Sequence, residues 1–244
     1  MEGVRELAAT GSLNGYHEMV MRYPIIALGA IVALGFGISS FGARSGVPAS
    51  AAATERARTP SGVTARTERL VLAGGCFWGM EAVFGSLRGV TSVVSGYAGG
   101  AAATAHYELV STGMTGHAES VAITYDPKRI SLAQIYQVYF SVAHDPTELD
   151  RQGPDEGSQY RSEIYYTTIA QAQAARIAID ALTRSKRFAS PIVTKVEPLD
   201  GFYPAEAYHQ HFMATHPDYP YIVANDLPKL DALHREFPAL VART

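Results

Sequence analysis

The segment LVLAGGCFWGM (residues 70–80) constrains the fold more than any other part of this sequence. Residues 68–73 have the apolar content of a β-strand, and the apolar residues after Cys76 recur near helical spacing. Gly74 and Gly75 lie between the two patterns, and a glycine pair lets the backbone turn sharply. We therefore predict a strand over 68–74 and a helix over 77–87, with Cys76 at the first turn of that helix.

The later patterns alternate between strand and helix. Ser131 is the expected N-cap of the second helix, and the polar segment 144–160 is long enough to be a functional loop. The fold class predicted from this order is α+β, a two-layer mixed-sheet sandwich with a ferredoxin-like split β-α-β core. Further strands are expected over 91–100, 117–127, 161–168 and 191–199, and helices over 131–143, 169–187, 205–216 and 227–237.

The N-terminal region differs from the rest of the chain. Residues 23–41 are apolar and carry no charge, Arg22 precedes them, and small residues follow, which is the layout of a secretory signal peptide. A retained membrane anchor is the alternative. We expect a signal peptide or anchor in residues 1–53, a flexible linker in 54–66 and a catalytic domain in 67–244, in a protein that is periplasmic or exported and possibly membrane-anchored.

Charge and cysteine content exclude several classes. The net charge of −3 and the lack of a basic run argue against nucleic-acid binding. The single cysteine excludes an intramolecular disulfide and the grouped Cys/His spacing of a structural zinc site. We expect no metal.

Cys76 is the candidate nucleophile. A thiol reacts as the thiolate, and the free N–H groups at a helix start stabilise that anion. A small buried hydrophobic residue is the competing interpretation, and the cysteine alone does not decide between the two. Phe77 and Trp78 are either core residues or an aromatic wall beside the sulfur that would hold a methyl group on a soft atom.

The motifs GCFWGME (75–81), GYAGG (96–100), TGHAESVAITYDP (115–127), HDP (144–146), QYRSEIYY (159–166) and FYPAEAYHQ (202–210) occur in this order. Together they resemble the A-type peptide methionine sulfoxide reductases, over about residues 70–213. The resemblance implies a mixed α/β sandwich that reduces the S-epimer of methionine sulfoxide, free or in proteins, to methionine.

The resemblance also implies the roles of single residues. Cys76 would attack the sulfoxide sulfur and become a sulfenic acid, and Glu119 would arrive protonated and donate to the oxygen. Two tyrosines would bind that oxygen, two aromatic residues would form the methyl pocket, and one acid would orient the substrate: Tyr107 and Tyr160, Phe77 and Trp78, and Asp155.

Two departures from the family's pattern affect these expectations. The segment before Tyr107 lacks the proline-rich stretch common in the family, and no second cysteine is present to attack the sulfenic acid. An outside thiol such as thioredoxin, glutaredoxin or a small thiol must then resolve oxidised Cys76, with no cofactor. We expect a monomer whose other partners are oxidised proteins and free methionine sulfoxide.

Two other functions remain open. One is a cysteine hydrolase that uses Cys76 with His117 or His209 as the base, and the other is a binding module with an inert thiol.

Overall fold

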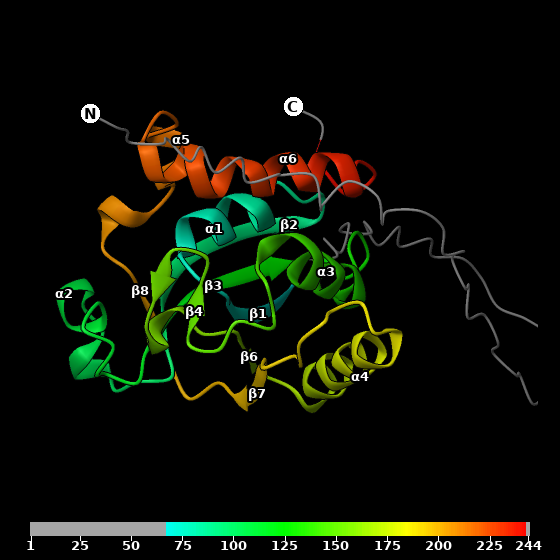
Figure 1. Ribbon diagram of the computed structural model, residues 1–244, viewed down its shortest axis with the longest axis horizontal. Coiled ribbons are helices and arrows are strands. Elements are labelled where there is room, and N and C mark those ends of the chain that lie inside the picture. Colours follow the sequence, from blue (N-terminus) through cyan, green and yellow to red (C-terminus); the bar gives the residue numbers. More distant parts are fainter. Residues whose placement is uncertain (1–66, 243–244) are drawn as a thin grey trace, which may run out of the picture. The chain divides into compact units, whose positions relative to one another are not determined.

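The computed structural model describes residues 67–242 (Figure 1). The predicted signal peptide or anchor and the linker lie outside these residues, so they stay predictions. In the described part, no helix has both the length and the apolar character needed to cross a bilayer. The strands are β1 (Glu68–Ala73), β2 (Val90–Ala98), β3 (Ala118–Tyr125), β4 (Arg151–Gln152), β5 (Asp155–Glu156), β6 (Glu163–Tyr166), β7 (Lys195–Pro198) and β8 (Phe202–Pro204). The α-helices are α1 (Phe77–Gly85), α2 (Tyr107–Val110), α3 (Leu132–Val138), α4 (Ile169–Ser185), α5 (Phe212–Thr215) and α6 (Leu227–Glu236).

Six strands form one mixed sheet in the order β7-β6-β1-β3-β2-β8. Strands β1, β3 and β2 pair antiparallel, as do β1 and β6, whereas β6 and β7 are parallel. Helix α1 joins β1 to β2, which flank β3, and α3 joins β3 to β6, which flank β1. This is the split β-α-β arrangement, and the predicted fold class is confirmed.

The main core lies between the sheet and its helices. Strand alternation directs Leu70 and Leu72 toward this face, where they join residues of α1 and α3, with Ala175 of α4 and Leu233 of α6 in the same cluster. Figure 1 shows α1 lying along the sheet with α6 above it. Helices α1, α3, α4 and α6 therefore bury apolar residues against the sheet or another helix.

The opposite face of the sheet is strongly curved. Only residues 199–201 connect β7 at one edge to β8 at the other. Six flat strands would place the edges about 24 Å apart, whereas four Cα steps extend at most about 14 Å. The sheet must therefore curl, and Tyr165 of β6 reaches across it to donate a hydrogen bond to the Ala98 carbonyl of β2 at 3.2 Å. Alanines fill much of the concave side: Ala73, Ala98, Ala118 and Ala122.

Two local expectations have clear outcomes. Ser131 is the N-cap of α3, as predicted, and it forms a full capping box with Gln134. The single helix expected over 205–216 is wrong, because that segment contains a 3₁₀ turn (Ala207–His209) and the four-residue α5. The helix breaks at His211, which has a left-handed backbone (φ 54°), and its N–H donates to Glu81 at 2.9 Å.

Candidate active site

The turn before α1 places the thiol at a helix start. Gly75 has φ +90°, and a Cβ there would lie 2.6 Å from Gln152 Cγ, so only glycine fits. Cys76 follows as the N-cap of α1, one position before the expected first turn. Its 8 % exposure is directed into a cavity of about 200 Å³. The sulfur can therefore be reached through this cavity, which is below the range of about 300–1,000 Å³ typical of drug-sized ligand sites.

The carboxyl of Glu119 lies beside Cys76 at the same helix end. Glu119 is near the start of β3, is 4 % exposed, and its Oε2 accepts the Phe77 N–H at 3.1 Å. Burial raises the pKa of Glu119 from 4.5 to about 8; the Phe77 N–H opposes this rise, and the charges of Asp155 and Asp226 add to it. Glu119 is therefore mostly protonated at neutral pH and able to donate a proton.

Burial also shifts the pKa of the Cys76 thiol. It raises the pKa of Cys76 well above the ordinary value, and the negative charges of Glu119 and Asp226 raise it further. The Trp78 backbone N–H and the Lys229 ammonium lower the pKa of Cys76. Because a protonated Glu119 carries no charge, the thiolate forms most easily while the carboxyl still holds its proton.

Two phenols enter the cavity from different segments. Tyr107 opens α2, where its N–H donates to Glu206 Oε1 at 3.0 Å, and Glu206 also accepts the Tyr97 O–H at 2.8 Å. Glu206 therefore fixes the start of α2, which carries Tyr107. Burial raises the pKa of Tyr107 and of Tyr160, so both phenols stay protonated as hydrogen-bond donors.

Arg161 fixes the turn that carries Tyr160. Its guanidinium donates to the Gly116 and His117 carbonyls at 2.9 and 3.1 Å, and to the Ser158 carbonyl at 2.8 Å. The first two carbonyls precede Glu119 in the chain, and Ser158 begins the 3₁₀ turn that ends at Tyr160. One arginine thus ties the acid and the phenol together.

Trp78 and Phe77 form the aromatic wall. Trp78 stacks on Phe212, with ring centroids 3.8 Å apart and planes 11° from parallel. Its indole N–H donates to His209 Nδ1 at 3.2 Å, so that nitrogen carries no proton. Phe77 is 1 % exposed and lines the same cavity, so it is both core and wall.

The far side of the cavity contains residues that the sequence reasoning missed. Tyr219 and Tyr221 line it and meet the Trp78 ring edge-on at 6.1 and 6.0 Å. Tyr221 donates its O–H to Asp155 Oδ2, and Asp155 also lines the cavity. Burial raises the pKa of Asp155, while the Tyr221 O–H and the Lys229 charge lower it. The HPDYPY segment (216–221) held the only sequence signal for these tyrosines.

All seven residues predicted for the site line this one cavity: Cys76, Phe77, Trp78, Tyr107, Glu119, Asp155 and Tyr160. The two histidines proposed as a hydrolase base have other partners. His117 Nδ1 accepts the Gly100 N–H at 3.2 Å, and His209 accepts from Trp78. In residues 67–242 no hydrogen bond joins a histidine to Cys76, and no group of three or more His, Cys, Asp and Glu side chains could hold a metal.

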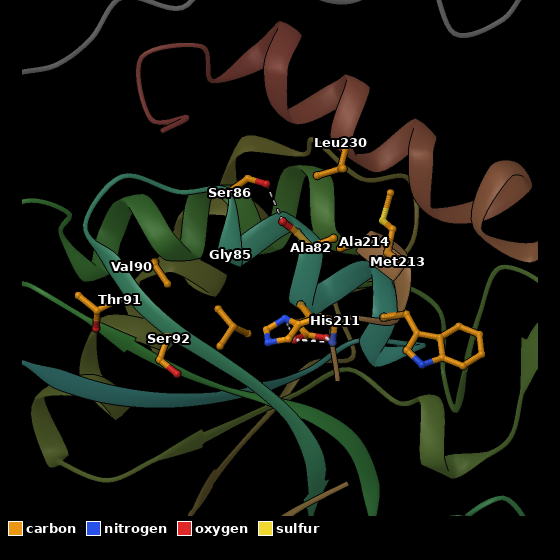
Figure 2. Close-up of a pocket in the computed structure, with 13 residues that line it drawn as sticks. Ala82, Gly85, Ser86, Val90, Thr91, Ser92, His211, Met213, Ala214 and Leu230 are labelled. Carbon is orange, nitrogen blue, oxygen red and sulfur yellow. Dashed lines mark hydrogen bonds and ion pairs between the residues drawn. The ribbon is translucent and has the colours of Figure 1, made fainter. Parts of the chain in front are cut away.

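A larger cavity of about 510 Å³ lies on the other side of α1. Figure 2 shows Val90, Thr91 and Ser92 of β2 below it, Ala82 and Gly85 of α1 beside it, and Leu230 of α6 above. It shares Trp78 with the smaller cavity but contains neither Cys76 nor Glu119. Size therefore does not mark the reactive site in this protein.

Comparison with known proteins gives a consistent result. A family model described as peptide methionine sulfoxide reductase matches residues 68–239. Peptide methionine sulfoxide reductase MsrA 2 of Mesorhizobium japonicum is 55 % identical over 174 residues, which are 71 % of this chain and 89 % of the relative. The MsrA 2 of Synechocystis is 50 % identical over 179 residues, covering 73 % of this chain and 84 % of the relative.

Solved structures agree with the sequence comparison. Reduced Mxr1 from Saccharomyces cerevisiae has a TM-score of 0.59 at 31 % identity, covering 64 % of this chain and 89 % of that chain. Methionine sulfoxide reductase A of Corynebacterium diphtheriae has a TM-score of 0.59 at 35 % identity, covering 62 % of this chain and 76 % of that chain.

Proposed function

The chain belongs to the peptide methionine sulfoxide reductases, and from that membership we propose that Cys76 attacks the sulfoxide sulfur while Glu119 protonates the oxygen. The enzyme reduces methionine sulfoxide to methionine. The observation that carries the proposed roles is the placement of the Glu119 carboxyl on the Phe77 N–H, one residue from the thiol. The pKa of about 8 lets that carboxyl hold a proton at neutral pH.

The chemical step moves one oxygen atom. The Cys76 thiolate attacks the sulfoxide sulfur as Glu119 transfers its proton to the oxygen, which is a poor leaving group until it is protonated. The attack forms an S–S bond. As the protonated oxygen then moves to the Cys76 sulfur, that S–S bond and the S–O bond of the sulfoxide break, which leaves a sulfenic acid on Cys76 and releases methionine. The methionine sulfur gains two electrons, and Cys76 loses two.

The cavity walls support the same orientation of the substrate. Tyr107 and Tyr160 donate to the sulfoxide oxygen as negative charge develops on it. Phe77 and Trp78 hold the methyl group against the sulfur. Asp155, fixed by Tyr221, accepts hydrogen bonds from the main chain of the substrate. One protomer supplies every one of these groups, so we propose that the enzyme acts as a monomer.

An outside thiol completes the cycle. The 244 residues contain one cysteine, so the sulfenic acid meets no second thiol of the chain. A donor thiol condenses with it to give a mixed disulfide and water, and a second thiol releases reduced Cys76 and an oxidised donor. Thioredoxin, glutaredoxin and small thiols have the required chemistry.

Turnover of the separated sulfoxide epimers tests the proposal. With dithiothreitol as the donor, we expect the full chain to consume the S-epimer and leave the R-epimer intact. Dimedone added without a donor should label Cys76 after one turnover, and Cys76→Ser should show neither result. Turnover without a sulfenic acid on Cys76, or hydrolysis of an ester in place of sulfoxide reduction, would reject the mechanism.

We also propose that the enzyme works outside the cytoplasm. The support is the uncharged apolar run over 23–41, preceded by Arg22 and followed by small residues. Fusing residues 1–66 to a phosphatase that is active only after export tests this. The length of the exported fusion protein then distinguishes a cleaved signal peptide, which shortens it, from a retained anchor, which leaves it full length. An inactive fusion would contradict export.

A further inference from the structure

A buried ion pair lies against the first turn of α1, and the mechanism above does not use it. Asp226 ends the π-helical turn Ile222–Asp226 and is fully buried, whereas the Lys229 side chain on α6 is 18 % exposed. Lys229 Nζ donates to Asp226 Oδ1 at 3.1 Å. The two side chains therefore form one charged unit between α6 and α1.

Gly79 shows how closely the pair approaches the catalytic helix. A Cβ at this position would lie 2.1 Å from Asp226 Oδ1 and 3.1 Å from Lys229 Nζ. Gly79 comes three residues after Cys76, and residues three apart lie on the same face of a helix. Because Gly79 has no side chain, the ion pair can pack against the same side of α1 on which Cys76 lies.

Burying this pair has a free-energy cost that its single hydrogen bond does not obviously offset. Asp226 Oδ2 has no hydrogen-bond partner in the described residues. Buried ion pairs are often no more stabilising than apolar residues of the same size. The burial of this pair is therefore no evidence that it stabilises the fold.

The other charges around Cys76 define what the pair can do. Glu119 and Asp226 act on the thiol with negative charge, and in residues 67–242 Lys229 is the one cation found to lower the pKa of Cys76. Asp155 faces the same cavity. Burial lowers the pKa of His144, behind Gly74, to about 4, so it stays neutral, and the raised pKa values keep the phenols Tyr107, Tyr160 and Tyr221 neutral.

We propose that Lys229 is a positioning residue for catalysis: Asp226 holds its ammonium against the first turn of α1, where the positive charge stabilises the Cys76 thiolate. This inference rests on the proposed function for its purpose, but not for its test. Removing the charge of Lys229 should disfavour the thiolate. Asp226→Asn removes a negative charge but keeps an oxygen that can accept from the Lys229 ammonium, so it should favour the thiolate. A purely structural pair would give no such opposite effects on the thiol.

The single cysteine makes the test direct. The rate of iodoacetamide alkylation against pH, measured without sulfoxide, reports the titration of Cys76 alone. Below its midpoint we expect Lys229→Met and Lys229→Gln to react about tenfold more slowly than the wild type, Asp226→Asn to react faster, and Lys229→Arg to resemble the wild type. Lys229→Gln can keep the hydrogen bond to Asp226, so it covers the case in which Lys229→Met fails to fold.

Two exposed residues of α6 provide matched charge controls. Arg235→Met and Asp231→Asn make the same charge changes on the same helix away from α1, and they should leave the alkylation profile unchanged. An unchanged profile in folded Lys229→Gln, or shifts in the same direction for Lys229→Gln and Asp226→Asn, would overturn the proposal. Because alkylation requires no reductase turnover, that failure is distinct from failure of the proposed function.

Discussion

The two ends of helix α1 have very different surroundings. At the N-terminal end Cys76 caps the helix, Glu119 accepts the Phe77 N–H, and Asp226 packs against Gly79. At the C-terminal end Gly85 faces open space beside the larger cavity, with no heavy atom within 4 Å of a Cβ placed there. Most of the buried ionisable groups lie at the N-terminal end, whereas the C-terminal end borders the larger cavity and its aliphatic side chains.

The difference shows how this fold separates chemistry from available space. Ionisable groups are costly to bury, and their burial shifts the pKa values of a thiol and a carboxyl in the way the reaction needs. The larger cavity has one buried acid in its wall, Glu81. Its carboxylate already accepts hydrogen bonds from the Ser95 hydroxyl and the His211 N–H and lies beside the His211 ring. A reactive site here is marked by unfavourable burial at a helix N-terminus.

Removing the acid at the N-terminal end should have the largest effect. We expect Glu119→Gln to lower the rate of the reductase step by about two to four orders of magnitude, because an amide cannot supply the proton. The loss of methionine sulfoxide in a single turnover measures this rate. Glu81→Gln is the matched control, since it neutralises a buried acid of α1 that faces the other cavity. A rate loss under tenfold in Glu119→Gln, or an equal loss in Glu81→Gln, would remove the distinction between the two ends.

The same acid should also make stability depend on pH. The folded pKa of Glu119, about 8, lies above its ordinary value of 4.5, so between these values the folded state binds more protons than the unfolded state. Its contribution to the free energy of unfolding is therefore full below about pH 4.5 and falls by up to about 1.4 kcal/mol for each pH unit as the pH rises toward 8.

Glu119→Gln isolates that contribution. The difference in the free energy of unfolding between the variant and the wild type should shift in favour of the variant from pH 5 to pH 8 and then level off. Urea unfolding at a series of pH values measures it, and the titration of other groups cancels in the difference. A constant difference across this range would mean that Glu119 is ionised in the folded protein.

Sequence reasoning reached most of the N-terminal end of α1. The Gly-Gly turn and the helix start at Cys76 could be inferred from neighbouring residues, whereas the roles of the other site residues followed only from the resemblance of their motifs to a known family. The C-terminal third was less predictable. The helix expected over 205–216 breaks because Glu81 accepts the His211 N–H and the Gln210 side chain pairs with the Ser95 backbone at 3.0 Å. Such long-range contacts override local propensity.

Tyr219, Tyr221 and the Asp226–Lys229 pair escaped prediction for the same reason. Their sequence neighbourhood, HPDYPYIVANDLPKL (216–230), contains ordinary turn and helix-start residues. Only the packing of the segment before α6, together with α6 itself, against α1 brings them close to the thiol (Figure 1). Knowledge of that packing requires the three-dimensional structure.

Adding a methyl group at the N-terminal end should be destabilising. Gly79→Ala places a Cβ 2.1 Å from Asp226 Oδ1, so the ion pair must move. Although alanine favours helices, we expect a net loss of about 1–3 kcal/mol in the free energy of unfolding, as for other overpacked sites. The rate should fall as well, because the charges beside Cys76 are displaced. Urea unfolding and single-turnover kinetics measure the two effects, and a variant as stable as the wild type would show that the pair is mobile.

The same change at the C-terminal end should have the smallest effect and the opposite sign. Gly85→Ala adds a methyl group where no atom lies within 4 Å, in a helical position that alanine adopts without strain. Alanine also restricts the unfolded chain more than glycine, so the free energy of unfolding should rise by about 0.5–1 kcal/mol. The reductase rate should stay within twofold of the wild type. Because Gly79→Ala and Gly85→Ala are the same substitution on one helix, measuring both under the same conditions cancels the intrinsic helix preference of alanine. Equal stability changes for the two variants would show that the surroundings of the two ends do not differ in the way the structure describes.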